Sequence, residues 1–157
     1  MRNRTRLIFW TVPLVVLLLF WVGCVWGATY YAAMADFGSG VTWYYRQGAW
    51  PDADNKTVPD PPDLERILDL LRGNEIVLAA GTYEDAELDS DNSLYLYGST
   101  TLRAAEPGDL DYGMYGGNVV LRSTADNTVY VWSSQTNILV KGITIAVSYT
   151  HLTLPTN

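Results

Sequence analysis

One short stretch most constrains the fold of this chain. Residues 73–83, Gly-Asn-Glu-Ile-Val-Leu-Ala-Ala-Gly-Thr-Tyr, form a β-type apolar run that closes in a Gly-Thr-Tyr turn. Four more apolar runs follow, each too short for a helix and each bounded by Gly, Asn, Asp, Ser or Thr: 94–97, 119–121, 129–131 and 138–140. Many short strands without a second helix predict a solenoid or a sandwich.

The spacing of these runs favours the solenoid. Residues 94–102 align with residues 138–145, so Gly98 and Gly142 lie 44 positions apart, which corresponds to two coils of about 22 residues. A three-faced parallel β-coil produces such a register, whereas a sandwich does not require one. Residues 105–118 interrupt the pattern, and we expect them to bulge out as a loop.

A single helical pattern precedes the first strong strand. Leu64, Ile67, Leu68 and Leu71 recur at helical spacing, and Gly73 is placed to end the helix. Asp60 or Asp63 serves as its N-cap. One apolar face has to be buried, so we predict a helix that plugs the open interior of the first coil.

The N-terminal end has the pattern of an export signal or a membrane anchor. Arg2, Arg4 and Arg6 precede residues 7–26, which carry no charge and are long enough to span a bilayer. Because basic flanks stay in the cytoplasm, both alternatives place the remaining chain outside it. We expect an extracytoplasmic protein, membrane-anchored through residues 7–26 or secreted, at the cell surface, with cleavage after Gly27 left open.

The C-terminal end has a different origin in our interpretation. Residues 147–156 back-translate codon for codon to GTC TCT TAT ACA CAT CTG ACG CTG CCG ACG, which resembles the transposase adaptor of sequencing libraries. We therefore expect residues 147–157 not to be native, and the natural chain to continue differently after about residue 146. His151, the single histidine, then carries no functional hypothesis.

These segments and the charge distribution define the organisation of the chain. All 17 acidic residues lie between Asp36 and Asp126, and three of the 10 basic residues precede the apolar segment, so the exported part carries 7 minus 17, or −10. Such a surface repels polyanions and excludes nucleic acid as a partner. The expected divisions are a signal peptide or anchor (1–27), an aromatic cap with an irregular loop (28–62), the helix with the first coils (63–146) and the adaptor-derived tail (147–157).

Two acidic groups are candidates for cation binding. Asp109 and Asp111 lie in a glycine-rich loop and offer two carboxylates to calcium, although the full calcium-loop spacing is absent. The alternative is a solvated loop in which these residues serve turn geometry. Acidic residues also alternate along residues 84–91, which would place them on one face of an extended segment. There they either gather cations or simply face solvent: Asp85, Glu87, Asp89 and Asp91.

Aromatic and basic residues suggest further alternatives. Five aromatic residues fit either a sugar-stacking surface or an aromatic cap over the core: Tyr30, Tyr31, Trp43, Tyr44 and Trp50. Arg103, Arg122 and Lys141 recur once per coil and could form an outward ladder, but none is paired with convincing metal ligands as a catalytic base. No catalytic residue and no cofactor other than calcium is predicted.

The order of these motifs carries a resemblance to a known family. Tyr30-Tyr31, a Gly-Ser-Gly turn, a Trp, the helix, then Glu75 to Tyr83 and Leu-Tyr-Leu-Tyr-Gly before Ser99 resemble the start of right-handed parallel β-helix repeat proteins of the pectate-lyase-like superfamily. The resemblance covers residues 29–145. It implies an all-β fold, a right-handed parallel β-helix of which only the first few coils are present, with an N-terminal capping helix preceded by one transmembrane or signal helix.

The resemblance also implies a range of functions. The superfamily holds polysaccharide lyases, glycoside hydrolases, epimerases, adhesins and surface proteins of bacteria, and its enzymes carry catalytic groups on middle coils that lie beyond residue 146 here. We expect an exported bacterial surface protein that is adhesive or binds polysaccharide or a cell-surface glycan. The alternatives are a lyase or glycoside hydrolase whose catalytic coils follow this segment, and a purely structural stalk.

Overall fold

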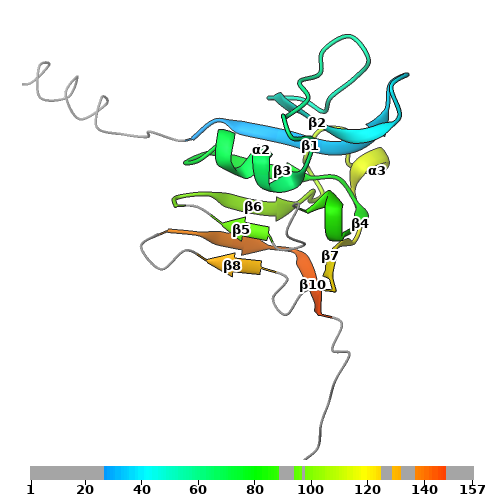
Figure 1. Cartoon of the computed structure of the whole chain (residues 1–157). Coiled ribbons are helices and arrows are strands. Elements are labelled where there is room, and N and C mark those ends of the chain that lie inside the picture. Colours follow the sequence, from blue (N-terminus) through cyan, green and yellow to red (C-terminus); the bar gives the residue numbers. More distant parts are fainter. Residues whose placement is uncertain (1–26, 89–93, 97, 125–128, 132–136, 148–157) are drawn as a thin grey trace, which may run out of the picture.

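A computed structural model of the chain describes residues 27–88, 94–96, 98–124, 129–131 and 137–147 (Figure 1). Within this part the chain alternates short strands with a few helical turns. The elements are β1 (Thr29–Asp36), β2 (Val41–Gln47), α2 (Leu64–Leu70), β3 (Glu75–Leu78), β4 (Gly81–Glu84), the 3-10 helix η1 (Asp85–Glu87), β5 (Leu94–Leu96), β6 (Thr101–Ala104), α3 (Tyr112–Tyr115), β7 (Val119–Ser123), β8 (Val129–Val131), β9 (Leu139–Lys141) and β10 (Ile143–Val147).

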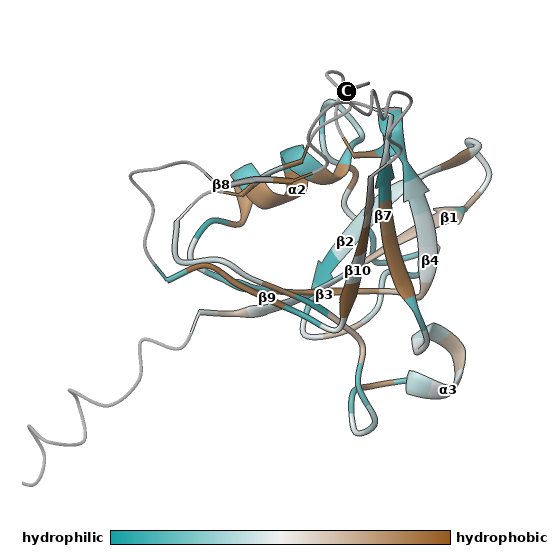
Figure 2. Ribbon diagram, turned by 90° about the horizontal axis from the view of Figure 1, so that it is seen from below, coloured by the Kyte–Doolittle hydropathy of each residue, from teal (hydrophilic) through white to brown (hydrophobic). Residues whose placement is uncertain are grey.

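The strands form three sheets around a common interior (Figure 2). The first sheet has the order β2-β1-β3-β6-β9, the second β10-β7-β4 and the third β5-β8. Neighbouring strands are parallel except β1 and β2, which are antiparallel. Parallel strands that neighbour each other in a sheet are far apart in the sequence. From β3 onward, the chain between them contributes strands to the other sheets.

The β1-β2 hairpin follows from a local turn. The Asp36 carboxylate accepts hydrogen bonds from the backbone N–H groups of Gly38 (2.8 Å) and Gly40 (3.1 Å). Gly38 and Gly40 have φ values of 103° and 91°, a region that glycine enters without steric cost. The chain therefore reverses, and Ala33 pairs with Tyr44 in the antiparallel register.

The predicted helix is confirmed as α2. The Asp63 carboxylate accepts a hydrogen bond from the Arg66 backbone N–H (2.8 Å) and so caps the helix, as Asp side chains commonly do. Leu64, Ile67 and Leu68 are fully buried. The helix packs against β5.

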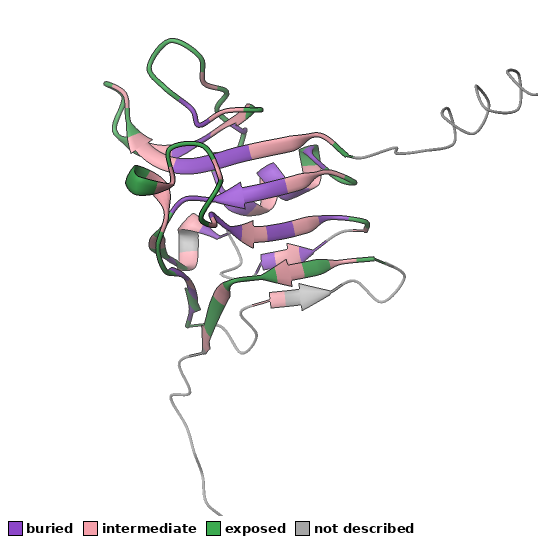
Figure 3. Ribbon diagram, turned by 180° about the vertical axis from the view of Figure 1, so that it is seen from behind, coloured by how far each residue is buried: buried purple, intermediate pink, exposed green. Residues whose placement is uncertain are grey.

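The main core lies inside the three sheets. On β3 and β6, Ile76 pairs with Leu102 and Leu78 with Ala104, and all four side chains are buried. Trp43 from β2 reaches this core, where its ring lies 4.6 Å from that of Tyr83 and its Nε1 donates to the Glu87 carbonyl oxygen (2.8 Å). The strands nearest β1 are largely buried in Figure 3, whereas much of β9 and β10 is exposed.

A second apolar cluster covers the outer face of the first sheet. Trp50 stacks on Tyr115 of α3 with ring centroids 4.3 Å apart, and it contacts Tyr31 of β1 edge-on at 4.9 Å. The Trp50 Nε1 donates to the Leu110 carbonyl oxygen (2.6 Å). Residues 105–118 are therefore folded back onto the sheet and contain a helix, whereas the sequence predicted a loop that bulges out.

The predicted fold class is wrong. The structure is mostly β with parallel sheets, but it is not the expected all-β right-handed parallel β-helix: the five-stranded sheet is mixed and two α-helices are present in the described residues. The hairpin after Asp36 accounts for the antiparallel pair, and aromatic packing under Trp50 accounts for α3. The predicted transmembrane or signal helix, residues 7–26, lies outside the described residues and stays a prediction; within the described ranges, no helix is long and apolar enough to cross a membrane.

Three local predictions also need correction. Glu75 pairs with Thr101, 26 positions later, and Thr101 with Leu139, 38 positions later, so the equal repeat of about 22 residues is wrong. The Gly-Thr-Tyr segment is the start of β4 and not a turn, because Gly81 pairs with Val119 in the second sheet. Residues 85–87 form η1 instead of an extended segment, while Asp89 and Asp91 lie outside the described residues.

Candidate functional site

A hollow of about 480 Å³ lies where β1 begins, β2 ends and the loop after β2 folds back. We call it the tyrosine hollow. Tyr30 and Tyr45 contribute aromatic rings to it. The polar side chains around them are Arg46, Gln47, Asp54, Asn55, Lys56 and Thr57.

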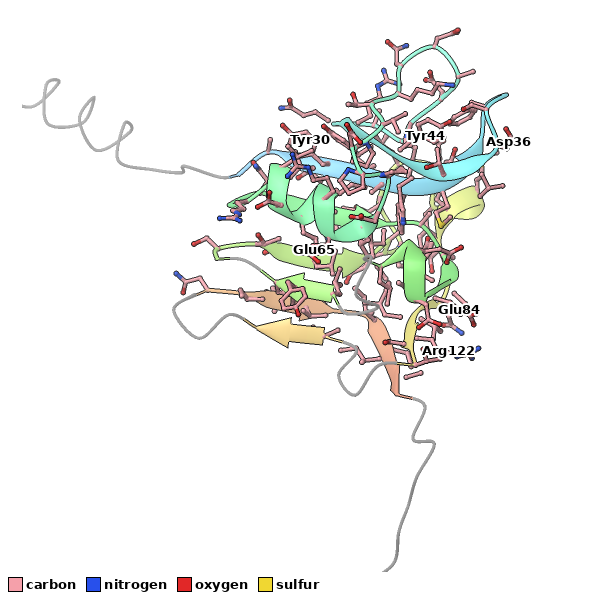
Figure 4. The ribbon with its side chains drawn as sticks, viewed as in Figure 1. Tyr30, Asp36, Tyr44, Glu65, Glu84 and Arg122 are labelled. Carbon is pink, nitrogen blue, oxygen red and sulfur yellow. The ribbon has the colours of Figure 1, made fainter. Side chains whose placement is uncertain are left out.

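Strand pairing brings the two tyrosines together. Tyr30 pairs with Gln47, and Tyr45 lies two positions before Gln47 on the same face of β2. The rings meet edge to face with centroids 6.2 Å apart. Both tyrosines are half-buried and contact the main core, so the rings are held firmly while part of each stays accessible to solvent. Figure 4 shows Tyr30 below the loop that joins β2 to α2.

Backbone hydrogen bonds fix the loop over the edge of β2. Tyr45 and Thr57 exchange two such bonds, from the Tyr45 N–H to the Thr57 oxygen (2.9 Å) and from the Thr57 N–H to the Tyr45 oxygen (3.1 Å). The Lys56 ammonium lies 4.7 Å from the centre of the Phe37 ring and 5.0 Å from that of Tyr44. These contacts stabilise the polar wall of the hollow in one position.

Asp52 organises the tip of this loop. Its carboxylate accepts hydrogen bonds from the backbone N–H groups of Asn55 (2.7 Å) and Asp54 (3.0 Å), and it forms an ion pair with Arg46 (2.7 Å). The Asn55 bond, followed by the bond from Asp54 and the Arg46 charge, lowers the pKa of Asp52. Asp52 therefore stays ionised and keeps its hydrogen bonds to the loop. The side chains of Gln47, Asp54 and Asn55 are exposed and line the hollow beside the tyrosines.

The five aromatic residues considered for sugar stacking differ in how deeply they are buried. Tyr31, Trp43, Tyr44 and Trp50 are buried in the two apolar clusters or against the loop, so they have no free ring face. Tyr30 remains half-exposed, and Tyr45 joins it although it was not among the five candidates. The alternation of faces along β2 was the signal that could have identified Tyr45, because it separates Tyr45 from Tyr44.

Asp109 and Asp111, the predicted calcium ligands, lie on the loop before α3. Both oxygens of Asp109 bind the Arg103 guanidinium, at 2.6 Å and 2.9 Å, and the Glu106 backbone N–H donates to one of them (2.7 Å). The Arg103 hydrogen bonds hold the pKa of Asp109 below its usual range. Asp111 precedes α3 with a φ of 50°. In the described ranges no group of three acidic, histidine or cysteine side chains could hold a metal ion, and calcium stays a prediction.

The three cations considered for a ladder are each paired with a carboxylate. Arg103 also binds Glu75 (2.8 Å), Arg122 binds Glu84 (2.7 Å) and Lys141 binds Glu106 (2.8 Å). Arg103 and Lys141 are direct neighbours on β6 and β9, but Arg122 lies on β7 of another sheet (Figure 4). The ladder is therefore divided between two faces of the molecule.

Comparison of the chain with protein-family models, with curated proteins and with solved structures finds no match. The resemblance to the pectate-lyase-like superfamily therefore stays a prediction.

Proposed function

We propose that this chain is an exported surface protein that binds a carbohydrate in the tyrosine hollow. The observation that carries the proposal is the pair of half-exposed tyrosines beside amide and carboxylate side chains. A pyranose ring has an apolar C–H face that packs on an aromatic ring and hydroxyl groups that need hydrogen-bond partners. The hollow offers both kinds of contact.

The side chains of the rim suit sugar hydroxyls. Gln47 and Asn55 each present an amide that donates and accepts, and Asp54 presents a carboxylate that accepts. All three side chains are exposed to solvent, so they can bind a sugar without breaking contacts in the core. The backbone of the loop is already held against β2, which lowers the entropy lost on binding.

Charge favours a neutral glycan over a polyanionic one. The part of the chain after residue 27 carries −10, and the two cations of the hollow are already engaged: Arg46 pairs with Asp52, and Lys56 lies over two aromatic rings. A polymer of uronate or sulfate groups would be repelled at low salt. We therefore expect neutral hexose or N-acetylhexosamine units as the ligand.

The test is binding of soluble neutral and acidic oligosaccharides, measured by calorimetry on wild type and three variants. Tyr45→Ala removes one ring of the hollow and should weaken binding of the preferred glycan at least about tenfold, equivalent to 1.4 kcal/mol. Tyr112→Ala is the matched control, since Tyr112 is also half-buried but packs against the second apolar cluster. It should leave the affinity unchanged.

Gln47→Ala provides a second variant that spares the core, because Gln47 is exposed. It should reduce affinity without changing the unfolding midpoint. The proposal is wrong if no neutral or acidic glycan binds the folded protein, or if both tyrosine variants bind equally well.

A further inference from the structure

We propose that Asn55 is an acceptor for an N-linked glycan and that this modification regulates access to the tyrosine hollow. The regulatory part rests on the proposed carbohydrate-binding function, whereas the acceptor part stands without it. The starting observation is that an acceptor motif coincides with the rim of the one hollow that carries two half-exposed aromatic rings among those described.

Asn55-Lys56-Thr57 has the Asn-X-Thr pattern in which the middle residue is not proline. The same pattern occurs once more, at Asn3-Arg4-Thr5, among the arginines before the apolar segment. Since that basic end is expected to stay in the cytoplasm, only the motif at Asn55 reaches the compartment where lipid-linked sugars are transferred.

The structure leaves this motif accessible. Asn55 and Thr57 are both exposed, and they lie on a long irregular connection between β2 and α2. The contact described for Asn55 is made by its backbone N–H to Asp52, so its side-chain amide is not needed to hold the loop. Because the loop runs over the surface, a modifying enzyme can reach Asn55 and Thr57 from solvent.

Transfer of an oligosaccharide to Asn55 requires one co-reactant, an oligosaccharide carried on a polyprenyl pyrophosphate. The Asn55 Nδ2 attacks the anomeric carbon of an oligosaccharide linked to a polyprenyl pyrophosphate. A C–N bond forms, the bond from the anomeric carbon to the pyrophosphate oxygen breaks, and polyprenyl pyrophosphate leaves with the electron pair. The amide proton passes to a base of the transferase.

The position of Asn55 links the modification to the hollow. Its side chain lines the same hollow as Tyr30 and Tyr45, so the first sugar attached to Nδ2 begins at the rim. That sugar has the apolar face and hydroxyl groups that the hollow is proposed to bind. A covalently attached sugar has a high effective concentration there, and it would exclude a glycan from solution.

The acceptor part is tested with the purified full chain in detergent, a purified single-subunit oligosaccharyltransferase and a polyprenyl-pyrophosphate-linked oligosaccharide. We expect a mass increase of one oligosaccharide on the peptide that contains Asn55. Thr57→Ala should abolish it, whereas Thr57→Ser, which keeps the motif, should retain it. An unmodified Asn55 under conditions in which the transferase fully modifies an acceptor peptide would overturn the proposal.

The regulatory part compares modified and unmodified wild-type protein from that reaction. Modification should weaken binding of the neutral glycan at least about tenfold. Equal affinity of the two forms would overturn the regulation. If the unmodified protein binds no glycan, the proposed function fails, and the mass measurement still decides whether Asn55 is an acceptor.

Discussion

At the scale of single residues, the Arg103 guanidinium joins three segments of the outer face. It binds Glu75 of β3 and Asp109 of the loop before α3, and Glu75 in turn accepts a hydrogen bond from the Thr29 hydroxyl of β1 (2.6 Å). The side chains of Arg103 and Asp109 are only 13% and 12% exposed. This geometry makes the network a structural one, because both carboxylates are already satisfied.

We predict that Arg103→Met destabilises the fold by about 2 to 4 kcal/mol, because it removes the cationic partner of the partly buried Asp109 and Glu75 carboxylates. Arg122→Met is the matched control: it breaks an ion pair whose side chains are 50% and 53% exposed, and it should cost less than about 1 kcal/mol. Urea unfolding of both variants measures the difference. Equal destabilisation would show that the network is no more than a surface ion pair.

The same network predicts how stability depends on pH. Hydrogen bonds from Arg103 lower the pKa of Asp109; burial raises the pKa of Glu75, but the bonds from Arg103 and Thr29 more than offset this and lower it. Carboxylates with a folded pKa below the unfolded value stabilise the protein above that value, so this contribution is lost as pH falls below about 4. Arg103→Met should flatten the acid limb of the stability profile, and an unchanged limb would contradict this assignment.

At the scale of elements, α2 depends on burial of one face. Leu68 is fully buried, whereas Leu70 in the same helix is 48% exposed. We predict that Leu68→Asp costs about 2 to 4 kcal/mol, because a charge replaces a core leucine. Leu70→Asp is the control and should change the free energy of unfolding by less than about 1 kcal/mol. Unchanged thermal unfolding of Leu68→Asp would refute the packing of α2 on the core.

Elements with a strong local sequence pattern were predictable, whereas elements with a weak or misleading pattern were not. The spacing from Leu64 to Leu71 and the N-cap at Asp63 identified α2. Helix α3 has four residues, too few for a periodic pattern, and it is stabilised by the contact between Tyr115 and Trp50, which are far apart in the chain. Strand β4 was taken for a turn because Gly81 is a common turn residue, whereas its pairing with Val119 decides its conformation.

At the scale of the whole molecule, one end presents unpaired strand edges. Within the described sheets, β9 is the last strand of the first sheet and β10 that of the second, and both lie toward the end of the molecule away from β1 and β2 (Figure 1). Leu139 and Ile145 on these strands are 52% and 45% exposed. At the opposite end, β2 pairs with Thr57 of the loop, which protects that edge in part.

We predict that residues 28–146, expressed alone, self-associate despite a net charge of −10, because exposed apolar edge strands pair with other chains. Replacing both Leu139 and Ile145 by lysine should shift the protein toward monomer, since charged edges resist pairing. Sedimentation over a concentration series measures the change. A wild-type segment that remains monomeric would count against the open edges.

The sequence by itself determined the local features of this protein: the capped helix, the glycine turn after Asp36, most of the strand positions and the acidic surface. Periodicity, capping and turn residues act within a few positions, so they can be recognised without knowing the fold. Only the tertiary structure decided which strands pair, that Asp109 binds Arg103, and that Tyr30 and Tyr45 form a hollow while Tyr31 and Tyr44 are buried. Those outcomes depend on contacts between residues that are far apart in the chain. A local sequence pattern does not indicate how much free energy such contacts contribute.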